Sequence, residues 1–265
     1  MNYFIHHPPK ILSNIVRHYW SLDGHVPTGE TYIHRTLANH CPELIFHYGG
    51  AFEELAGDYN TSKTFTTGIH GQTSQIRRFT AKEKYGIFGV HLQPYAIPML
   101  FGISSGEFKN ELVDLSLLGQ SGKDLTNQIL SAQSNNQRLQ LINGFLQQRL
   151  KAFDRPEIVY ATQQIYRLNG LVNIKALADG ACLSHRQFER KFMEHVGFTP
   201  KSFSRIVRFR SLINNYKRHD STLTKAAYDF GYYDQAHFIQ DFKQFSGYNP
   251  HTYFSGGAKD VFYAP

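Results

Sequence analysis

The chain has 265 residues, a length that leaves one large domain or two ordinary ones open. Hydrophobic residues make up 41% and charged residues 18%, which excludes a largely disordered chain and is typical of a globular protein. The net charge is +7, and residues 1–154 hold 13 Lys or Arg against 12 Asp or Glu, whereas residues 155–265 hold 15 against 9. This asymmetry is expected where one part of a protein meets a polyanion, although a solvated basic surface gives the same count.

The cysteines are typical of a protein in a reducing compartment, and the first residues carry no pattern of an export signal. Cys41 and Cys182 are the only cysteines, and their spacing is neither paired nor metal-like. The N-terminus lacks a basic start followed by an apolar run, and no stretch approaches the ~18 apolar residues that span a bilayer. We therefore expect a cytoplasmic protein without a membrane partner, and we expect Cys182 in the core.

Short apolar and aromatic runs follow one another from residue 3 to residue 94. They are separated by Gly, Asn, Asp and Thr, which are typical of tight turns. Because the runs recur about every ten residues and no long helix interrupts them, they predict an antiparallel sandwich or barrel rather than βαβ units. The runs are IVRHYWSL, TYIHRTL, ELIFHYGG, KTFTTGI, QIRRFT and GIFGVHL.

The pattern changes to helical after Pro98. Helices are predicted at residues 109–118 and from residue 122 or 123 to residue 153, with a break at Asn135 and Asn136. An apolar stripe on the second stretch packs on the sheet or makes a dimer contact, and packing within the chain is favoured. The stripe consists of Leu139, Ile142, Leu146 and Leu150.

A domain boundary is predicted just before Pro156. Proline disfavours a helical conformation at Arg155 but suits the first position of a new helix. We therefore expect one domain at residues 1–152 and a second at residues 155–257. The predicted fold is α+β: an N-terminal antiparallel β-barrel or sandwich with helices, followed by an all-helical C-terminal domain.

The C-terminal region repeats itself at an offset of 50 residues. Self-similarity at a fixed offset indicates that one structural unit occurs twice. Each copy is expected to contain a short helix, a tight turn and an amphipathic helix, at about residues 172–196 and 222–246, with Gly180 and Gly231 at the turns. The aligned pairs include Lys175 and Lys225, Asp179 and Asp229, Phe188 and Phe238, Phe192 and Phe242, Gly197 and Gly247, and Pro200 and Pro250.

The second helix of each copy combines an aromatic inner face with a polar outer face. Ser184 is expected to cap the first, with Gln187 completing a capping box, and Asp234 to cap the second. In DNA-binding proteins, a helix followed by a short turn and an amphipathic helix places the second helix in the major groove. A generic helical hairpin explains one copy equally well, whereas two copies favour DNA binding.

A long, partly buried helix is predicted in the segment PKSFSRIVRFRSLINNYK between the two copies. Such a helix would fix the two units relative to each other. Recognition helices held ~34 Å apart would then enter successive major grooves on one face of the DNA.

The C-terminal sequence resembles the AraC/XylS family of transcription regulators over residues 157–254. The strongest piece is AAYDFGYYDQAHFIQDFKQFSGYNPHTYF, and IKALADGACLSHRQFERKFMEHVGFTPKSF is a weaker first motif. The resemblance implies a sequence-specific regulator of the bacterial nucleoid that binds double-stranded operator or promoter DNA. RNA polymerase is a further partner if the regulator is an activator, and both activator and repressor remain open.

By that resemblance, both recognition helices read bases. Arginine addresses guanine, glutamine addresses adenine, and glutamate accepts from cytosine. Ala236 offers only a methyl contact and Gln240 stands where arginine is common, so we expect weaker readout by the second helix. The expected base contacts are Arg186, Glu189, Arg190, Gln235, Ala236 and Gln240. The expected phosphate contacts, for which ordinary solvation of a helix is the alternative, are Ser184, His185, Lys191, Arg205 and Lys243.

In such regulators the N-terminal part often senses a small molecule or mediates dimerisation, and many have a cupin-like β-barrel there. The predicted strands agree with that architecture, and the N-terminal sequence also resembles a branch without a well-known effector. A small-molecule effector and a homodimer are therefore expected partners. Aromatic residues that line a pocket or, as is favoured, form the sheet's core are Tyr3, Tyr19, Trp20, Tyr32, Phe46 and Tyr48.

The alternative function is a metal-dependent enzyme in the N-terminal domain. His40, Glu43 and His47 suggest it, but a cupin metal site requires closely alternating histidines followed by a carboxylate, which this sequence lacks. Cys41 has no identifiable base, and no cysteine cluster supports a DNA-repair fusion. We therefore expect no enzyme, no catalytic residue, no metal and no cofactor.

Overall fold

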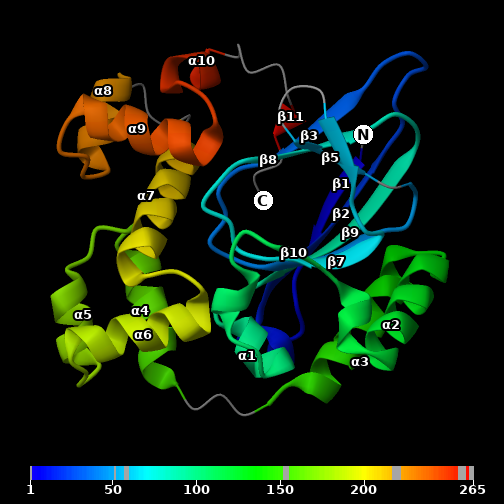
Figure 1. Ribbon diagram of the computed structural model, residues 1–265, viewed down its shortest axis with the longest axis horizontal. Helices are drawn as coiled ribbons and strands as arrows, with labels where there is room; N and C mark the ends of the chain where they lie inside the picture. Colours follow the sequence, from blue (N-terminus) through cyan, green and yellow to red (C-terminus); the bar gives the residue numbers. More distant parts are fainter. Residues whose placement is uncertain are drawn as a thin grey trace.

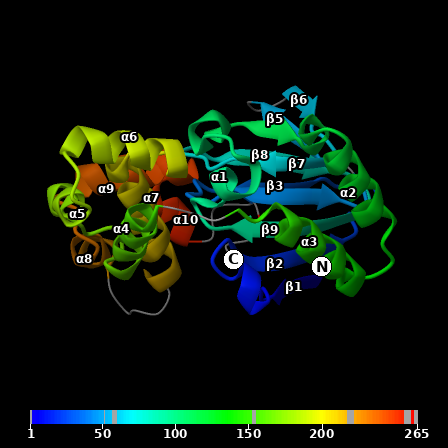
Figure 2. The same ribbon diagram turned by 90° about the horizontal axis from the view of Figure 1, so that it is seen from below.

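The structure is a computed structural model that describes residues 2–50, 52–56, 60–151, 155–216, 222–255 and 261–262. Strands fill most of the first part of the chain, and helices fill most of the second, at one end of the sheets (Figures 1 and 2). The predicted α+β fold, with an antiparallel N-terminal β region and a helical C-terminal region, is confirmed.

The larger of the two sheets consists of β1 (Asn2–His6), β2 (Val16–Gly24), β4 (Glu43–His47), β7 (Thr67–His70), β9 (Tyr85–Leu92) and β10 (Leu112–Asp114). Its order is β1-β2-β9-β4-β7-β10, and every pair is antiparallel. Strand β9 is buried along its whole length, as is typical of a strand covered on both faces. Gly89 lies opposite Trp20, whose indole ring occupies the space that a Cβ would need.

The smaller sheet consists of β3 (Tyr32–Thr36), β5 (Glu53–Ala56), β6 (Asn60–Lys63), β8 (Arg77–Ala81) and β11 (Val261–Phe262). Its order is β11-β3-β8-β5-β6. Strand β11 lies parallel to β3, with Val261 opposite His34, so the last described residues return to the N-terminal part. This return is not predicted by the sequence.

Each of the six predicted runs overlaps a strand. The strands that the sequence patterns miss are β1, β5, β6, β10 and β11. All of them except β5 lie at an edge of a sheet. An edge strand pairs on one side only and buries little apolar surface, so its sequence carries a weak signal.

Two apolar clusters hold the fold together. One fills the space between the sheets and includes Trp20 and Phe79. The other begins on the opposite face of the larger sheet at Phe88 and continues through Ile142 to Phe203 in the C-terminal helices. Because this second cluster is continuous, the N-terminal and C-terminal parts share a core. The boundary expected at residues 152–155 stays a prediction, and residues 152–154 lie outside the described residues.

Helices cover the outer face of the larger sheet (Figure 2). They are α1 (Ala96–Phe101), α2 (Gln120–Ser131) and α3 (Asn135–Arg149). The predicted long helix is therefore divided, and the break falls just before Asn135, because Ser134 accepts a hydrogen bond from the backbone N–H of Gln137 and caps α3.

The predicted apolar stripe lies on α3 and packs within the chain. Ile142 and Leu146 are fully buried. Leu139 and Leu150 are partly buried against the same cluster. The stripe is thus part of the core, in agreement with the favoured alternative.

The helix predicted at residues 109–118 is wrong. Asn110 adopts a left-handed φ of 63°, and β10 follows, with Val113 opposite Ile69 of β7. A short 3-10 helix, Leu115–Leu118, begins where the Asp114 carboxylate accepts from the N–H of Ser116. Pairing with a sheet edge outweighed the local helical preference.

The C-terminal helices are α4 (Pro156–Arg167), α5 (Ile174–Gly180), α6 (His185–Val196), α7 (Pro200–Tyr216), α8 (Leu223–Asp229), α9 (Gln235–Ser246) and α10 (Pro250–Phe254). As predicted, α4 starts at the proline. Figure 1 shows α7 running from the group of α4, α5 and α6 to the group of α8, α9 and α10. It is the long helix expected between the two copies of the repeat.

Candidate nucleic-acid interface

The first copy of the repeat forms a helix-turn-helix from α5 and α6. The Ser184 side chain accepts from the N–H of Gln187, whose own side chain accepts from the N–H of Ser184, so the predicted capping box is present. The turn differs from the prediction. Gly180 ends α5, and the left-handed residue is Cys182, with a φ of 53°. Cys182 is exposed rather than in the core, as its place in the turn requires.

The second copy forms an equivalent unit from α8 and α9. Gly231, with a φ of +68°, makes the predicted turn. The Asp234 carboxylate accepts from the N–H of His237 and caps α9. Both recognition helices, α6 and α9, end at a left-handed glycine, Gly197 and Gly247, so the repeat preserves their end as well as their start.

Most of the predicted contact residues are exposed on the two recognition helices. Glu189 and Lys191 are half-buried: Glu189 lies 3.7 Å from His185, and the Lys191 ammonium lies 3.4 Å from the carboxylate of Glu157 on α4. The exposed ones on α6 and at its cap are Ser184, His185, Arg186 and Arg190, and those on α9 are Gln235, Ala236, Gln240 and Lys243. The exposed residues thus extend along the outer faces of both helices from their N-terminal ends, which is where a helix-turn-helix contacts bases.

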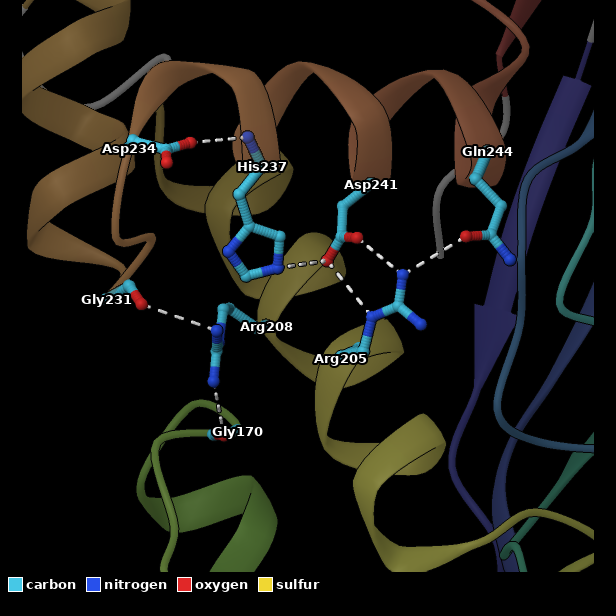
Figure 3. A network of polar contacts seen from close by, with 8 residues as sticks. All are labelled: Gly170, Arg205, Arg208, Gly231, Asp234, His237, Asp241 and Gln244. Atoms are coloured by element: carbon cyan, nitrogen blue, oxygen red, sulfur yellow. Dashed lines mark hydrogen bonds and ion pairs between the residues drawn. The ribbon is translucent and has the colours of Figure 1, made fainter.

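Arg205, expected at phosphate, lies in a network that joins α7 to α9 (Figure 3). Its Nη2 donates to Oδ1 of Asp241 at 2.5 Å and to Oε1 of Gln244 at 3.1 Å, and its Nε donates to Oδ2 of Asp241 at 3.3 Å. Asp241 is 1% exposed, and Nε2 of His237 lies 3.7 Å from it. The hydrogen bond with Asp241 raises the pKa of Arg205. A phosphate contact by Arg205 stays a prediction.

Arg208 on the same helix joins the two helix-turn-helix units. One guanidinium nitrogen lies 3.4 Å from the carbonyl of Gly231, and the other lies 3.3 Å from the carbonyl of Gly170 before α5 (Figure 3). Its guanidinium also stacks over the ring of Tyr232 at 5.5 Å. Sequence reasoning missed both this bridge and Asp241, because their partners lie about 20 to 40 residues away along the chain and no periodic pattern marks them.

The N-terminal part holds the C-terminal end of α6. Carbonyl groups at a helix end lack partners within the helix and need donors from outside. Nε2 of Gln72 donates to the carbonyl of Val196 at 3.0 Å and to that of Ser105 at 2.7 Å. The Ser105 hydroxyl donates to the backbone carbonyl of His195 at 2.7 Å. Two consecutive carbonyls at the end of α6 thus accept hydrogen bonds from side chains of the N-terminal part.

The same region also holds the end of α9. The N–H of Ala38 donates to the carbonyl of Phe245 at 2.9 Å. Ile76 packs against Gly247, where a Cβ would lie 3.2 Å from its side chain. The guanidinium of Arg35 stacks over the ring of Tyr248 at 3.9 Å. The N-terminal part therefore fixes both recognition helices at one end and leaves their N-terminal turns exposed.

Replacing Gln72 by alanine is expected to lower the free energy of unfolding by ~1–3 kcal/mol, because two buried carbonyls lose their donor. Urea unfolding of the full chain measures this. Gln75 in the same loop is exposed, so Gln75→Ala is the matched control and should change stability by less than ~0.5 kcal/mol. Equal effects of the two changes would contradict the assigned role of Gln72.

The residues of the enzyme alternative do not form one site. His40 packs between the rings of Tyr166 and Phe203, each 5.2 Å away, whereas Glu43 and His47 line the space between the sheets. Within the described ranges, no three His, Cys, Asp or Glu side chains are arranged to hold a metal ion. In the same ranges, no helix has the length and apolar character that crossing a membrane requires.

Comparisons with known proteins agree with the two-part organisation. Residues 5–114 match a domain family of unknown function (DUF6597), and residues 177–256 match a helix-turn-helix domain family. An uncharacterized HTH-type transcriptional regulator of Haemophilus influenzae is 32% identical over 81 residues, which are 31% of this chain and 27% of that protein. The chain thus covers about a quarter of that relative's length.

Two solved structures align with most of this chain. ToxT from Vibrio cholerae O395 is 13% identical, with a TM-score of 0.46 over 89% of this chain and 97% of that one. The AraC-like transcriptional activator CuxR is 12% identical, with a TM-score of 0.26 over 81% of this chain and 86% of that one. The C-terminal part carries the assignment: residues 177–256 belong to a helix-turn-helix domain family, and their two units carry the motif residues by which the sequence resembles the AraC/XylS regulators.

Proposed function

We propose that the protein is a sequence-specific DNA-binding transcription regulator. The observation that carries this proposal is the paired exposure of the two recognition helices, whose N-terminal turns face solvent while their C-terminal ends are held by the rest of the chain. Helices α6 and α9 would enter successive major grooves, with α7 setting their separation. The protein would act in the bacterial cytoplasm, and it would contact RNA polymerase if it is an activator.

The proposed base contacts are Arg186, Glu189, Arg190, Gln235, Ala236 and Gln240. Their support is their position on the outer faces of α6 and α9. The proposed phosphate contacts are Ser184, His185, Lys191, Arg205 and Lys243. Lys191 and Arg205 would have to exchange part of their internal ion pairs for phosphate, so we expect them to contribute least.

Residues 1–152 are proposed as a sensory or dimerisation domain that controls the DNA affinity of residues 155–257. Support comes from the loop between β7 and β8, which contacts the ends of both recognition helices. A ligand or a second copy of the chain that shifts this loop would change the placement of both helices together.

Binding to random genomic fragments tests the proposed function. Phosphate contacts should give affinity that falls with added salt, even on DNA without the operator. An electrophoretic mobility assay between about 50 and 200 mM salt measures this fall. A purified, folded protein without any salt-sensitive binding would contradict the proposal.

Alanine at Arg190 is expected to weaken specific binding by ~1–3 kcal/mol, and alanine at Gln240 by less, because an arginine–guanine contact would be charge-assisted whereas a glutamine–adenine contact would not. Competition between operator and non-operator DNA measures the loss. Both side chains are exposed, so neither change should alter folding. Equal losses would contradict the proposed asymmetry between α6 and α9.

A further inference from the structure

A polar cavity of about 130 Å³ lies between the larger sheet and helices α4 and α7. Arg17, His18 and His91 line it from the sheet, and Arg210 and Asn214 line it from α7. No acidic side chain of the described residues lines it. Both halves of the protein thus contribute to a space whose lining includes two arginines and three histidines.

Two histidines of this cavity, the buried His40 and the half-buried His18, have unused hydrogen-bonding capacity. His40 is 8% exposed, and neither of its ring nitrogens has a partner of adequate geometry among the described residues; the same holds for Nε2 of His18. Burial lowers the pKa of His18 to about 4 and also lowers the pKa of His40. An imidazole carries at least one N–H donor in either protonation state. A buried polar group without a partner costs ~1–3 kcal/mol, which points to an acceptor that fills the cavity.

The cavity also holds positive charge that the surrounding residues do not pair. No ion pair joins Arg17 or Arg210 to another residue in the part of the chain that the structure describes. Glu43 is near, but its carboxylate lies 3.1 Å from Nδ1 of His91 and accepts from Asn39 at 3.1 Å. Burial lowers the pKa of His91, but hydrogen bonds with Cys41 and Glu43 outweigh this and raise it to about 9. The carboxylate of Glu43 is therefore paired with the cationic ring of His91.

The Cys41 thiol is the other acidic group in this region, 3.5 Å from the hydroxyl of Tyr166. Burial raises its pKa, but the neighbouring His40 and Arg17 outweigh burial and lower it well below the usual value. A thiolate balances one positive charge at most. Because Glu43 is paired with His91, at least one of the guanidinium groups of Arg17 and Arg210 has no negatively charged partner.

We propose that this cavity binds a compact oxyanion, which presents carboxylate or phosphoryl oxygens to Arg17, Arg210, His18 and His40. The small volume and the polar lining do not suit a long apolar ligand. A wider surface cleft of about 500 Å³ shares Arg17 and His18 with the cavity, so the two lie side by side. The binding itself does not depend on the proposed function, whereas its regulatory consequence rests on it.

That consequence follows from the place of Arg210. It lies on α7, two turns or less from Arg205 and Arg208, which tie this helix to α9 and to both helix-turn-helix turns. An anion held between Arg17 and Arg210 would join α7 to β2. Its binding would therefore change the placement of both recognition helices, and with it the affinity for DNA.

Isothermal titration calorimetry of the full chain tests the binding. Inorganic phosphate and a four-carbon dicarboxylate are titrated separately, in chloride at matched ionic strength. We expect saturable binding of one anion per chain, and the anion that binds tells phosphoryl from carboxylate. Arg210→Gln and Arg17→Gln should each weaken it about tenfold or more, since each removes a charged donor. Arg17 is exposed, so its variant keeps the test valid if Arg210→Gln unfolds.

Two variants control for binding elsewhere. Lys201→Gln removes an exposed charge from the same helix outside the cavity, and Arg190→Gln removes one from the proposed DNA surface. Both should bind the anion as the unmodified chain does. The inference is overturned if neither anion binds saturably, if the Arg17 variant binds as tightly as the unmodified chain, or if Arg190→Gln abolishes binding.

DNA affinity measured with and without the bound anion separates the two proposals. Saturation with the anion should change the affinity of the unmodified chain and leave that of Arg17→Gln unchanged. An unchanged affinity in both overturns the regulatory part alone. Failure to bind DNA in the absence of any anion contradicts the proposed function and leaves the calorimetric result standing.

Discussion

Replacing Arg205 by alanine is expected to lower the free energy of unfolding by about 3–5 kcal/mol. The change leaves the carboxylate of Asp241, which is 1% exposed, without the guanidinium that donates two hydrogen bonds to it. The remaining partner, Nε2 of His237, lies 3.7 Å away and cannot replace them. A buried charge that has lost its partner is among the most destabilising changes known for a single residue. Urea unfolding measures the loss.

Two further variants separate the buried charge from the lost packing of the arginine chain. Asp241→Asn combined with Arg205→Ala should be more stable than Arg205→Ala alone, because a neutral amide costs less to bury than a carboxylate. Lys201→Ala, an exposed position on the same helix, should change stability by less than ~0.5 kcal/mol. A double variant less stable than Arg205→Ala would count against an unpaired charge as the cause.

The same variant decides between the internal role of Arg205 and its predicted phosphate contact. An arginine that only contacts phosphate would leave stability unchanged and would reduce the salt dependence of DNA binding by about one counterion. The ion pair with Asp241 predicts the opposite: a large loss of stability and an unchanged salt slope once folding is restored by lower temperature.

The helix-turn-helix units could be predicted because their signals are local. Caps such as Ser184 and Asp234, and aromatic residues four positions apart, act within one or two helical turns, so the sequence contains both members of each interaction. Once the first unit is recognised, the 50-residue offset of the repeat gives the position of the second unit in the sequence. The glycines at 197 and 247 belong to the same local signal.

The contacts that orient the units could not be predicted, because they join residues far apart in the chain. Gln72 lies 124 positions from Val196, and neither has a pattern that indicates the other. One signal was available in the repeat. Lys191 and Asp241 occupy the same position in the two copies with opposite charges, and each pairs with an opposite charge on the preceding long helix. A charge reversed within a repeat indicates an internal ion pair rather than a shared contact with DNA.

Acid between about pH 6.5 and 4 is expected to destabilise the protein steeply. Burial lowers the pKa of His34 and of His47 to about 4 and that of His70 to about 3, from 6.5 in the unfolded chain, and neighbouring histidines lower the last two further. These three side chains line the small space between the two sheets. His18, with a pKa of about 4 through burial, behaves in the same way at the cavity between the parts. All four are therefore neutral in the folded protein at pH 6.

The direction of the effect follows from where protons bind. Below pH 6.5 the unfolded chain takes up protons on these histidines, whereas the folded protein does not until the pH approaches 4. The stability they contribute is thus fully present above pH 6.5 and is lost as the pH falls through this window. Each histidine adds up to ~1.4 kcal/mol per pH unit to the slope. Urea unfolding at pH 7.5, 6.0 and 5.0 measures the combined slope.

Two histidine variants check that slope with opposite expectations. His70→Gln removes a group with a lowered pKa, so the fall in stability between pH 6.5 and 4 should become shallower by about one proton. His91 has a pKa raised to about 9 by Cys41 and Glu43, so its contribution is fully present below pH 6.5 and is lost as the pH rises through 9. His91→Gln should therefore lower stability at pH 7.5 and leave the acid slope as it was. If both variants shift the curve equally at every pH, the slope comes from other groups, and the histidines between the sheets act through packing alone.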